Sequence, residues 1–131
     1  MPPRDRASKA VQGGSPPEAL RRELARGTAE LAILAVLGGG RRYGYELLSL
    51  LNGLTGGAPE IKEGTLYPIL HRLEDAGQIT STWEAHDRTP PRKYYLLTAT
   101  GQDQLVALRA EWERLVAGMR RLLDASEGVE Q

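Results

Sequence analysis

Residues 62–79, KEGTLYPILHRLEDAGQI, constrain the fold of this chain more than any other stretch. Leu66 is followed by aliphatic residues at the third, fourth and seventh positions, which places four aliphatic side chains on one stripe of a helix. Pro68 is tolerated only where its missing N–H is not needed, so the helix is predicted to begin at about Gly64 or Thr65. Because such a stripe must pack on other elements, the stretch predicts a helical core.

The opposite side of this expected helix carries groups that suit contact with DNA. Its first turns offer a hydroxyl, a phenol, an imidazole and a guanidinium, whereas the acids Glu74 and Asp75 come near its end at Gly77. A helix whose N-terminal end can approach phosphate is what a recognition helix requires. The candidate contact residues of this stretch are Lys62, Gly64, Thr65, Tyr67, Pro68, His71 and Arg72.

Length and composition limit the other possibilities. The 131 residues suffice for one domain of ordinary size, and 17 basic residues balance 17 acidic ones. DNA binding must therefore come from local patches of charge. The absence of cysteine excludes disulfides and thiolate metal sites, and no apolar run approaches the roughly 18 residues of a membrane span. We expect a cytoplasmic protein that does not contact the membrane.

The chain before the expected recognition helix divides into a tail and helical segments. Residues 1–17 are rich in Pro, Gly, Ser and charge and are predicted to be a disordered tail. Residues 18–37 have a helical pattern, which either tolerates Gly27 as one helix or stops there so that Thr28 caps a second helix. The second arrangement is favoured because threonine is a good N-cap. Residues 45–54 give a further short amphipathic helix.

Two runs rich in β-branched and aromatic residues follow the expected recognition helix. They are residues 79–85 and 92–98, and a polar loop with two prolines, residues 86–91, separates them. Two strands joined by a protruding loop directly after such a helix describe a winged helix-turn-helix domain, here residues 18–98. The fold class is therefore mainly α with a small β wing. The candidate DNA contacts on the wing are Arg88, Arg92 and Lys93.

The last part of the chain is predicted to be a dimerisation helix. Thr98 or Thr100 caps it, and it spans residues 99–124 before a disordered tail at residues 125–131. Its apolar positions alternate in steps of three and four, a narrow heptad seam that favours pairing with a second helix in a homodimer. The seam residues are Leu105, Leu108, Trp112, Leu115, Met119 and Leu122.

Trp112 gives the seam a further candidate role. Two symmetry-related indoles that face each other can hold a planar aromatic molecule between them, which makes Trp112 a candidate effector site. The simpler alternative, that Trp112 only fills the interface, is favoured because a large aromatic residue is ordinary in a core.

No catalytic constellation is present. His71 and His86 stand apart, and the chain has no His–Glu pair at metal spacing, no nucleophile elbow and no phosphate-binding loop. We therefore expect no enzymatic activity, no metal site and no cofactor.

Several motifs together resemble one known family. EGTLYPILHRLEDAG, the ITSTWE run, PPRKYYLLTATG and a heptad helix closely resemble the PadR family of bacterial transcriptional regulators, and YGYELLSLL matches that family's second-helix pattern. The resemblance covers about residues 24–123. Lys62 and Glu63 stand where many members have Ser-Pro, and the C-terminal helix is of the short type.

The resemblance implies a winged-helix dimer that represses genes by binding a pseudo-palindromic operator in double-stranded DNA, with release by a small molecule or a stress signal. The family's DNA-contacting motif falls on Thr65, Tyr67, Pro68 and Arg72, and its wing on residues 88–93. The main alternative, which the zero net charge leaves open, is a winged-helix module that contacts only other proteins.

Overall fold

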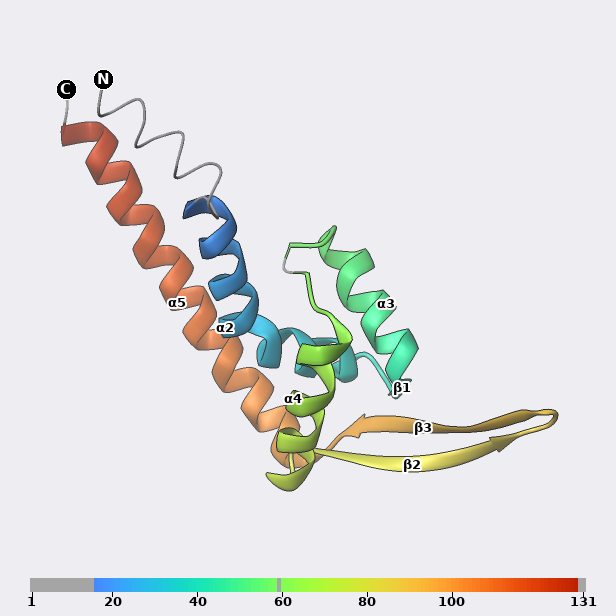
Figure 1. The fold of residues 1–131 in the computed structure, drawn as a ribbon. Coiled ribbons are helices and arrows are strands. Elements are labelled where there is room, and N and C mark those ends of the chain that lie inside the picture. The colour runs from blue at the N-terminus through green and yellow to red at the C-terminus, as the bar shows by residue number, and fades with distance from the viewer. Residues whose placement is uncertain (1–15, 59, 130–131) are drawn as a thin grey trace, which may run out of the picture.

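The computed structural model describes residues 16–58 and 60–129, which form four helices and one three-stranded antiparallel sheet. A hairpin extends from the helical body on one side and a long helix leaves it on the other (Figure 1). The prediction of a mainly helical protein with a small β wing is confirmed. The elements are α2 (Pro16–Gly38), β1 (Arg42–Tyr43), α3 (Gly44–Thr55), α4 (Glu63–Asp75), β2 (Ile79–His86), β3 (Thr89–Leu97) and α5 (Ala99–Val129).

The core lies where α2, α3 and α4 meet. The predicted four-residue stripe of α4 is buried, and it packs with aliphatic side chains from both neighbouring helices. Each such side chain contributes on the order of 1.5–3 kcal/mol relative to its exposed state. The buried aliphatic residues of the three helices are Ala29, Ile33, Leu34, Leu37, Leu47, Leu51, Leu66, Ile69, Leu70 and Leu73.

The start of α4 differs slightly from the prediction. The helix begins at Glu63, with Lys62 as N-cap, rather than at Gly64 or Thr65. Pro68 therefore lies in the second turn, where its missing N–H deprives the carbonyl of Gly64 of an intrahelical donor. Gly64 is exposed, so water can reach this carbonyl.

The end of α4 follows the prediction. Gly77 has a φ of 74°, a left-handed conformation that glycine adopts without strain. Its amide donates to the carbonyl of Glu74 at 3.0 Å, and the amide of Gln78 donates to that of Leu73 at 2.9 Å. These two bonds form a Schellman motif, which ends the helix and turns the chain into β2.

α2 is one continuous helix, so the predicted break at Gly27 is wrong. Thr28 caps no second helix, because its Oγ1 donates to the carbonyl of Leu24 at 2.6 Å within the same helix. A glycine inside a helix costs only about 1 kcal/mol relative to alanine, which the burial of the following turns offsets. The helix begins at Pro16, inside the expected tail, and residues 1–15 of that tail lie outside the described residues.

The sheet contains one strand that the sequence did not predict. Residues 42–43 form β1 and pair with β3 at Tyr94 and Tyr95. The strand order is β1-β3-β2, so β3 is the central strand. Tyr95 and Leu97 face the core, so alternate side chains of this strand point inward.

The wing is a longer hairpin than predicted. Residues 86–91 do not form a protruding loop, because β2 runs to His86, β3 begins at Thr89 and only two residues separate them. The pairing is irregular between Glu84 and His86, opposite Pro90 and Pro91. Proline is accepted at such an irregularity because no regular ladder bond is lost there.

α5 begins at the predicted cap. Thr98 Oγ1 accepts the N–H of Gly101 at 3.0 Å and donates to the carbonyl of Gly77 at 2.7 Å, so it joins α5 to the end of α4. A Cβ at Gly101 would lie 2.7 Å from Leu97 Cδ1 and 2.9 Å from the carbonyl carbon of Gln78. Only glycine allows this close approach.

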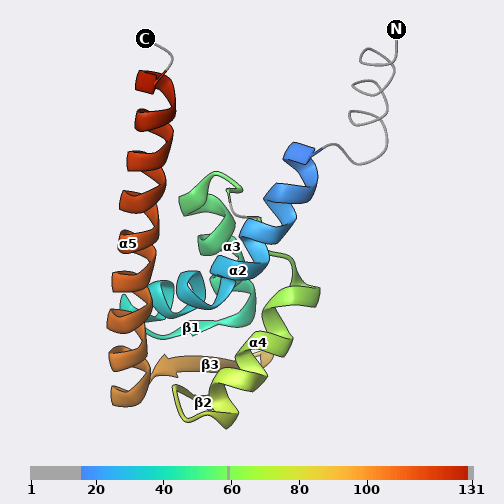
Figure 2. The same ribbon diagram turned by 90° about the vertical axis from the view of Figure 1, so that its left-hand side faces the viewer.

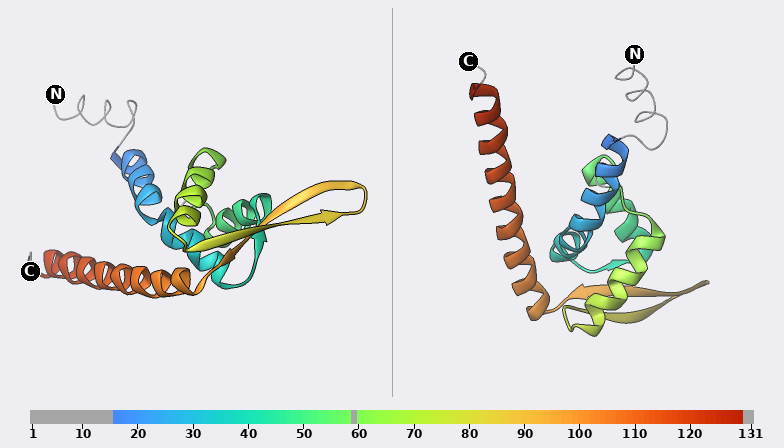
Figure 3. Two further views of the ribbon diagram at one scale, coloured as in Figure 1. Left: turned by 90° about the horizontal axis from the view of Figure 1, so that it is seen from below. Right: turned by 60° about the vertical axis from the view of Figure 1, so that its left-hand side comes forward.

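The remainder of α5 departs from the prediction in two ways. The helix continues to Val129, so the expected tail at residues 125–131 is helical as far as residue 129, and residues 130–131 lie outside the described residues. Leu105 and Leu108 of the heptad seam pack against the core of their own chain. Beyond them α5 and α2 separate, and the rest of the seam projects away from the core (Figures 2 and 3).

Candidate nucleic-acid interface

The outward face of α4 gathers most of the side chains predicted to contact DNA. Thr65, Pro68, His71 and Arg72 are exposed, whereas the apolar stripe on the opposite side is buried. Lys62 and Gly64 are exposed at the start of the same helix. The structure therefore brings these six residues to one surface.

Tyr67 lies at the edge of this face and is 42% exposed. Its ring reaches the first residue of α3, because a Cβ at Gly44 would lie 3.1 Å from the ring's Cζ. Glycine at position 44 thus leaves room for the phenol. Tyr67 lies along the start of α3, so its position depends on two helices.

Arg72 is connected to α2 through Glu30. Its Nη2 lies 3.3 Å from Glu30 Oε2, while 62% of the Arg72 side chain stays exposed. An ion pair this exposed contributes less than about 1 kcal/mol. The guanidinium can therefore exchange this carboxylate for a DNA phosphate or base.

Two of the wing cations are stacked on tyrosine rings. The guanidinium of Arg92 lies 4.4 Å from the ring centroid of Tyr43, and Lys93 Nζ lies 5.3 Å from that of Tyr95. Lys93 Nζ is also 3.8 Å from a carboxylate oxygen of Glu74. Because these contacts restrict the side-chain rotamers, the two charges keep fixed positions beside α4.

Two further arginines flank this pair. Arg88, the predicted wing contact, is exposed in the two-residue turn with a φ of 66°. Arg41, outside the predicted contact set, stacks 4.4 Å from the ring centroid of Tyr94 and forms an ion pair with Glu84 of the wing. The cations of the hairpin thus continue onto the segment before β1.

Sequence reasoning missed the exposed aromatic residues of this surface. Trp83 is 67% exposed on β2 opposite Lys93, and Tyr45 is 72% exposed at the start of α3. They line a hollow of about 310 Å³ with Tyr67 and Arg92. Alternation along residues 79–85 places Trp83 on the same face as the buried Ile79, so no local pattern signals its exposure, which arises because the hairpin extends beyond the core.

Tyr95 of β3 packs in the core between α4 and the wing. It is only 6% exposed, and this burial, with smaller contributions from Tyr67 and Glu74, raises the pKa of its hydroxyl. Glu74 in turn accepts a hydrogen bond from Ser81 Oγ at 2.5 Å. The phenol therefore stays neutral at physiological pH and belongs to the structural support of the interface.

The outer part of the α5 seam is uncovered. Trp112, Leu115, Met119 and Leu122 are 41%, 55%, 45% and 66% exposed. Leu20 and Leu24 of α2 are also more than half exposed. This part of the molecule carries apolar surface on both helices.

Within residues 16–58 and 60–129, no three His, Cys, Asp or Glu side chains are grouped in a way that holds a metal ion. No helix in the same part of the chain is long and apolar enough to cross a membrane.

A recognition-type helix with its partner helix α3, followed directly by a β hairpin, defines a winged helix-turn-helix protein. Residues 33–107 match the family model described as the transcriptional regulator PadR-like family, and this chain belongs to that family. The resemblance inferred from the motifs is confirmed. The family is one of transcriptional regulators with a DNA-binding winged helix, not of enzymes.

Similar proteins agree with this assignment. A transcriptional regulator from Clostridium thermocellum superposes with a TM-score of 0.69 at 31% identity, covering 76% of this chain and 96% of its own. A PadR-like regulator from Bacillus cereus superposes with a TM-score of 0.68 at 33% identity, covering 77% of this chain and 96% of its own. An uncharacterized protein from Lysinibacillus sphaericus is 32% identical over 85% of this chain and 99% of its own.

Proposed function

We propose that this regulator is a dimeric repressor that binds a pseudo-palindromic operator. In each subunit α4 enters the major groove, while Arg88, Arg92 and Lys93 of the wing hold the adjacent backbone. The observation that carries the proposal is the outward face of α4, whose exposed polar residues adjoin cations held in place on tyrosine rings.

The proposed dimer forms through α5. Trp112, Leu115, Met119 and Leu122 are exposed at heptad spacing, an arrangement that a second helix covers in a coiled coil. The exposed Leu20 and Leu24 of α2 extend the apolar surface available to a partner subunit. Two recognition helices fixed in this way can meet half-sites separated by about 34 Å, one turn of DNA.

The proposed release mechanism uses Trp112. In a symmetric dimer two indoles near the seam can enclose a planar aromatic effector, with stacking worth on the order of 1 kcal/mol per contact. An effector that binds better to a wider seam would change the spacing of the recognition helices and release the operator. Fluorescence of Trp112 in a Trp83→Phe variant, titrated with planar phenolic and polycyclic compounds, tests this step. If no compound quenches Trp112 fluorescence, and cells that carry the Trp112→Leu variant respond to the inducer as the wild type does, Trp112 has only a structural role.

DNA selection tests the central proposal. Purified protein should retain a pseudo-palindromic sequence from a random pool, and the same sequence should occur in a promoter that it retards in electrophoresis. Tyr67→Ala should weaken operator binding by roughly 1–3 kcal/mol with little change on random DNA. Arg88→Ala should weaken both and lower the salt slope by about one per subunit. Recovery of no enriched sequence would favour the protein–protein interaction module.

A further inference from the structure

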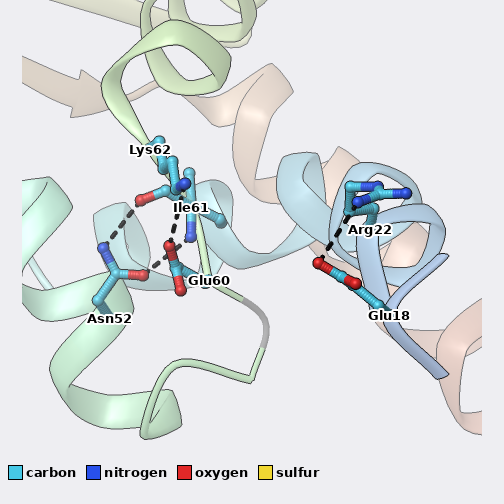
Figure 4. Close-up of polar contacts among 6 residues, drawn as sticks. All are labelled: Glu18, Arg22, Asn52, Glu60, Ile61 and Lys62. Atoms are coloured by element: carbon cyan, nitrogen blue, oxygen red, sulfur yellow. Dashed lines mark hydrogen bonds and ion pairs between the residues drawn. The ribbon is translucent and has the colours of Figure 1, made fainter. Parts of the chain in front are cut away.

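A groove of about 390 Å³ separates the N-terminal half of α2 from the segment that leads into α4. Figure 4 shows residues of both sides, with Glu18 and Arg22 on α2 and Glu60, Ile61 and Lys62 across from them. The lining includes two carboxylates and four cations. The cations are Arg21, Arg22, Arg26 and Lys62.

The ion pairs around this groove leave an excess of positive charge. Glu18 pairs with Arg22 at 3.8 Å and Glu60 with Lys62 at 3.6 Å, each within its own segment. Arg26 pairs at 2.7 Å with Glu23, which does not line the groove. Among the described residues Arg21 forms no ion pair, and no ion pair crosses the groove. Arg21 is therefore the one cation of the lining without an ion-pair partner in the part of the chain that the structure describes, and the groove with Glu23 keeps a net charge of +1.

The groove lies next to the proposed recognition surface. Thr65 belongs both to its lining and to the outward face of α4. The first turn of α4 and the N-terminal half of α2 lie on the side of the molecule away from α5 (Figure 2). A DNA strand that borders the major groove entered by α4 can therefore pass the mouth of this groove.

The groove is also separate from the apolar surface of α2. Residues two positions apart on a helix point in nearly opposite directions, at 100° per residue, so Leu20 and Leu24 face away from Arg22 and Arg26. A partner helix on the leucines would leave Arg22 and Arg26 open, whereas Arg21 lies only about 60° from Leu24 and would border that helix.

We infer that this groove binds a backbone phosphate of the operator beside the major groove read by α4, with Arg21, Arg26 and Lys62 as its main ligands. The inference rests on the proposed function, because it needs a chain that binds DNA. Such a contact carries no base information; it fixes the depth and angle of α4 through the rigid connection to α2. The interface then has phosphate contacts on both sides of the recognition helix, at the wing and at α2.

The test uses Arg21→Gln with Arg26→Gln in the full-length chain. The salt slope of operator binding should fall by about 0.9 for each phosphate charge that the variant no longer neutralises, so by about 1.8 per subunit. Affinity at physiological salt should fall by about tenfold, equally for operator and random DNA. The matching Arg→Lys pair should retain most of the slope, and Glu60→Gln should strengthen binding to both DNAs.

Arg120→Gln, on the exposed outward side of α5, is the matched control and should bind as wild type. If the wild type binds an operator and the variant with both arginines replaced shows the same salt slope, the groove does not contact DNA. If the wild type binds no operator at all, the proposed function itself is overturned. Replacing chloride by inorganic phosphate at equal ionic strength separates the two sources of phosphate. Competition with DNA that is confined to the wild type supports the backbone site, because the ion then occupies a contact that the variant lacks, whereas phosphate that binds the wild type without changing its DNA affinity indicates a site for a free oxyanion and refutes it.

Discussion

Asn52 closes the connection between α3 and the recognition helix, so its removal should weaken both the fold and DNA binding. Its Nδ2 donates to the carbonyl of Ile61 at 2.8 Å and its Oδ1 accepts the N–H of Ile61 at 2.9 Å (Figure 4). Its Nδ2 also donates to the carbonyl of Leu48 at 3.2 Å. Ile61 is 2% exposed and directly precedes the N-cap of α4. One side chain thus pairs both backbone groups of a buried residue, as a neighbouring strand would.

The magnitude follows from these three bonds. Each contributes about 0.5–1.5 kcal/mol, and a buried backbone group left without a partner costs about 1–3 kcal/mol. Since the segment can partly open to water, Asn52→Ala should lower the free energy of unfolding by about 2–4 kcal/mol. Asn52→Asp should lose the two bonds donated by Nδ2 and recover part of this loss at acid pH, where the carboxyl is protonated and can donate.

Urea denaturation at matched protein concentration measures these differences, because the stability of a dimer depends on concentration. Ser49→Ala, an exposed substitution on α3, is the control. The reasoning is refuted if Asn52→Ala falls within about 0.5 kcal/mol of this control, or if it loses stability yet binds the operator at full strength.

Three other predictions concern the dimer, pH and the support of Tyr67. Leu115→Glu with Leu122→Glu should give a monomer in sedimentation, because it places four charges in the seam, whereas Val106→Glu, exposed but off the seam, should remain a dimer. Burial raises the pKa of Tyr95, so its hydroxyl ionises at lower pH in the unfolded chain than in the folded one. The free energy of unfolding should therefore fall above about pH 10, and by more in the wild type than in Tyr95→Phe. Equal losses of stability at alkaline pH in the denaturation curves of the two proteins would contradict this assignment. Gly44→Ala should displace Tyr67 and weaken operator binding by roughly 1–3 kcal/mol, whereas Gly53→Ala, with no neighbour within 4 Å, should bind normally in electrophoretic titrations.

The sequence predicted the elements whose signal is local and periodic. The buried stripe of α4 and the cap at Thr98 each follow from the spacing or chemistry of adjacent residues. The seam of α5 was recognised for the same reason. Its periodicity could not show which seam residues pack on their own chain, since Leu105 joins the core and Leu122 does not.

The errors arose where tertiary pairing overrides local preference. β1 is two residues long and exists only because β3 lies beside it, which no local pattern reports. Pro90 and Pro91 suggested a loop, yet an irregular ladder accommodates them within a strand. Gly27 suggested a break, yet the burial of the following turns carries the helix through it. The groove between α2 and α4 has no signal in sequence because its walls, residues 18–26 and 60–65, lie 34–47 positions apart.

The neutral net charge of the chain has a structural counterpart at the interface. Arg72 is paired with Glu30, Lys93 with Glu74, and Arg41 with Glu84 in the free protein. A phosphate that binds one of these cations must displace a carboxylate, so part of the electrostatic gain on any DNA is offset by the ion pair that breaks. This offset is the same for every sequence, whereas base contacts from α4 are gained only on the operator. The paired acids therefore weaken binding to random DNA without lowering discrimination, which in a genome with about 10⁶–10⁹ competing sites keeps more of the regulator free to occupy its operator.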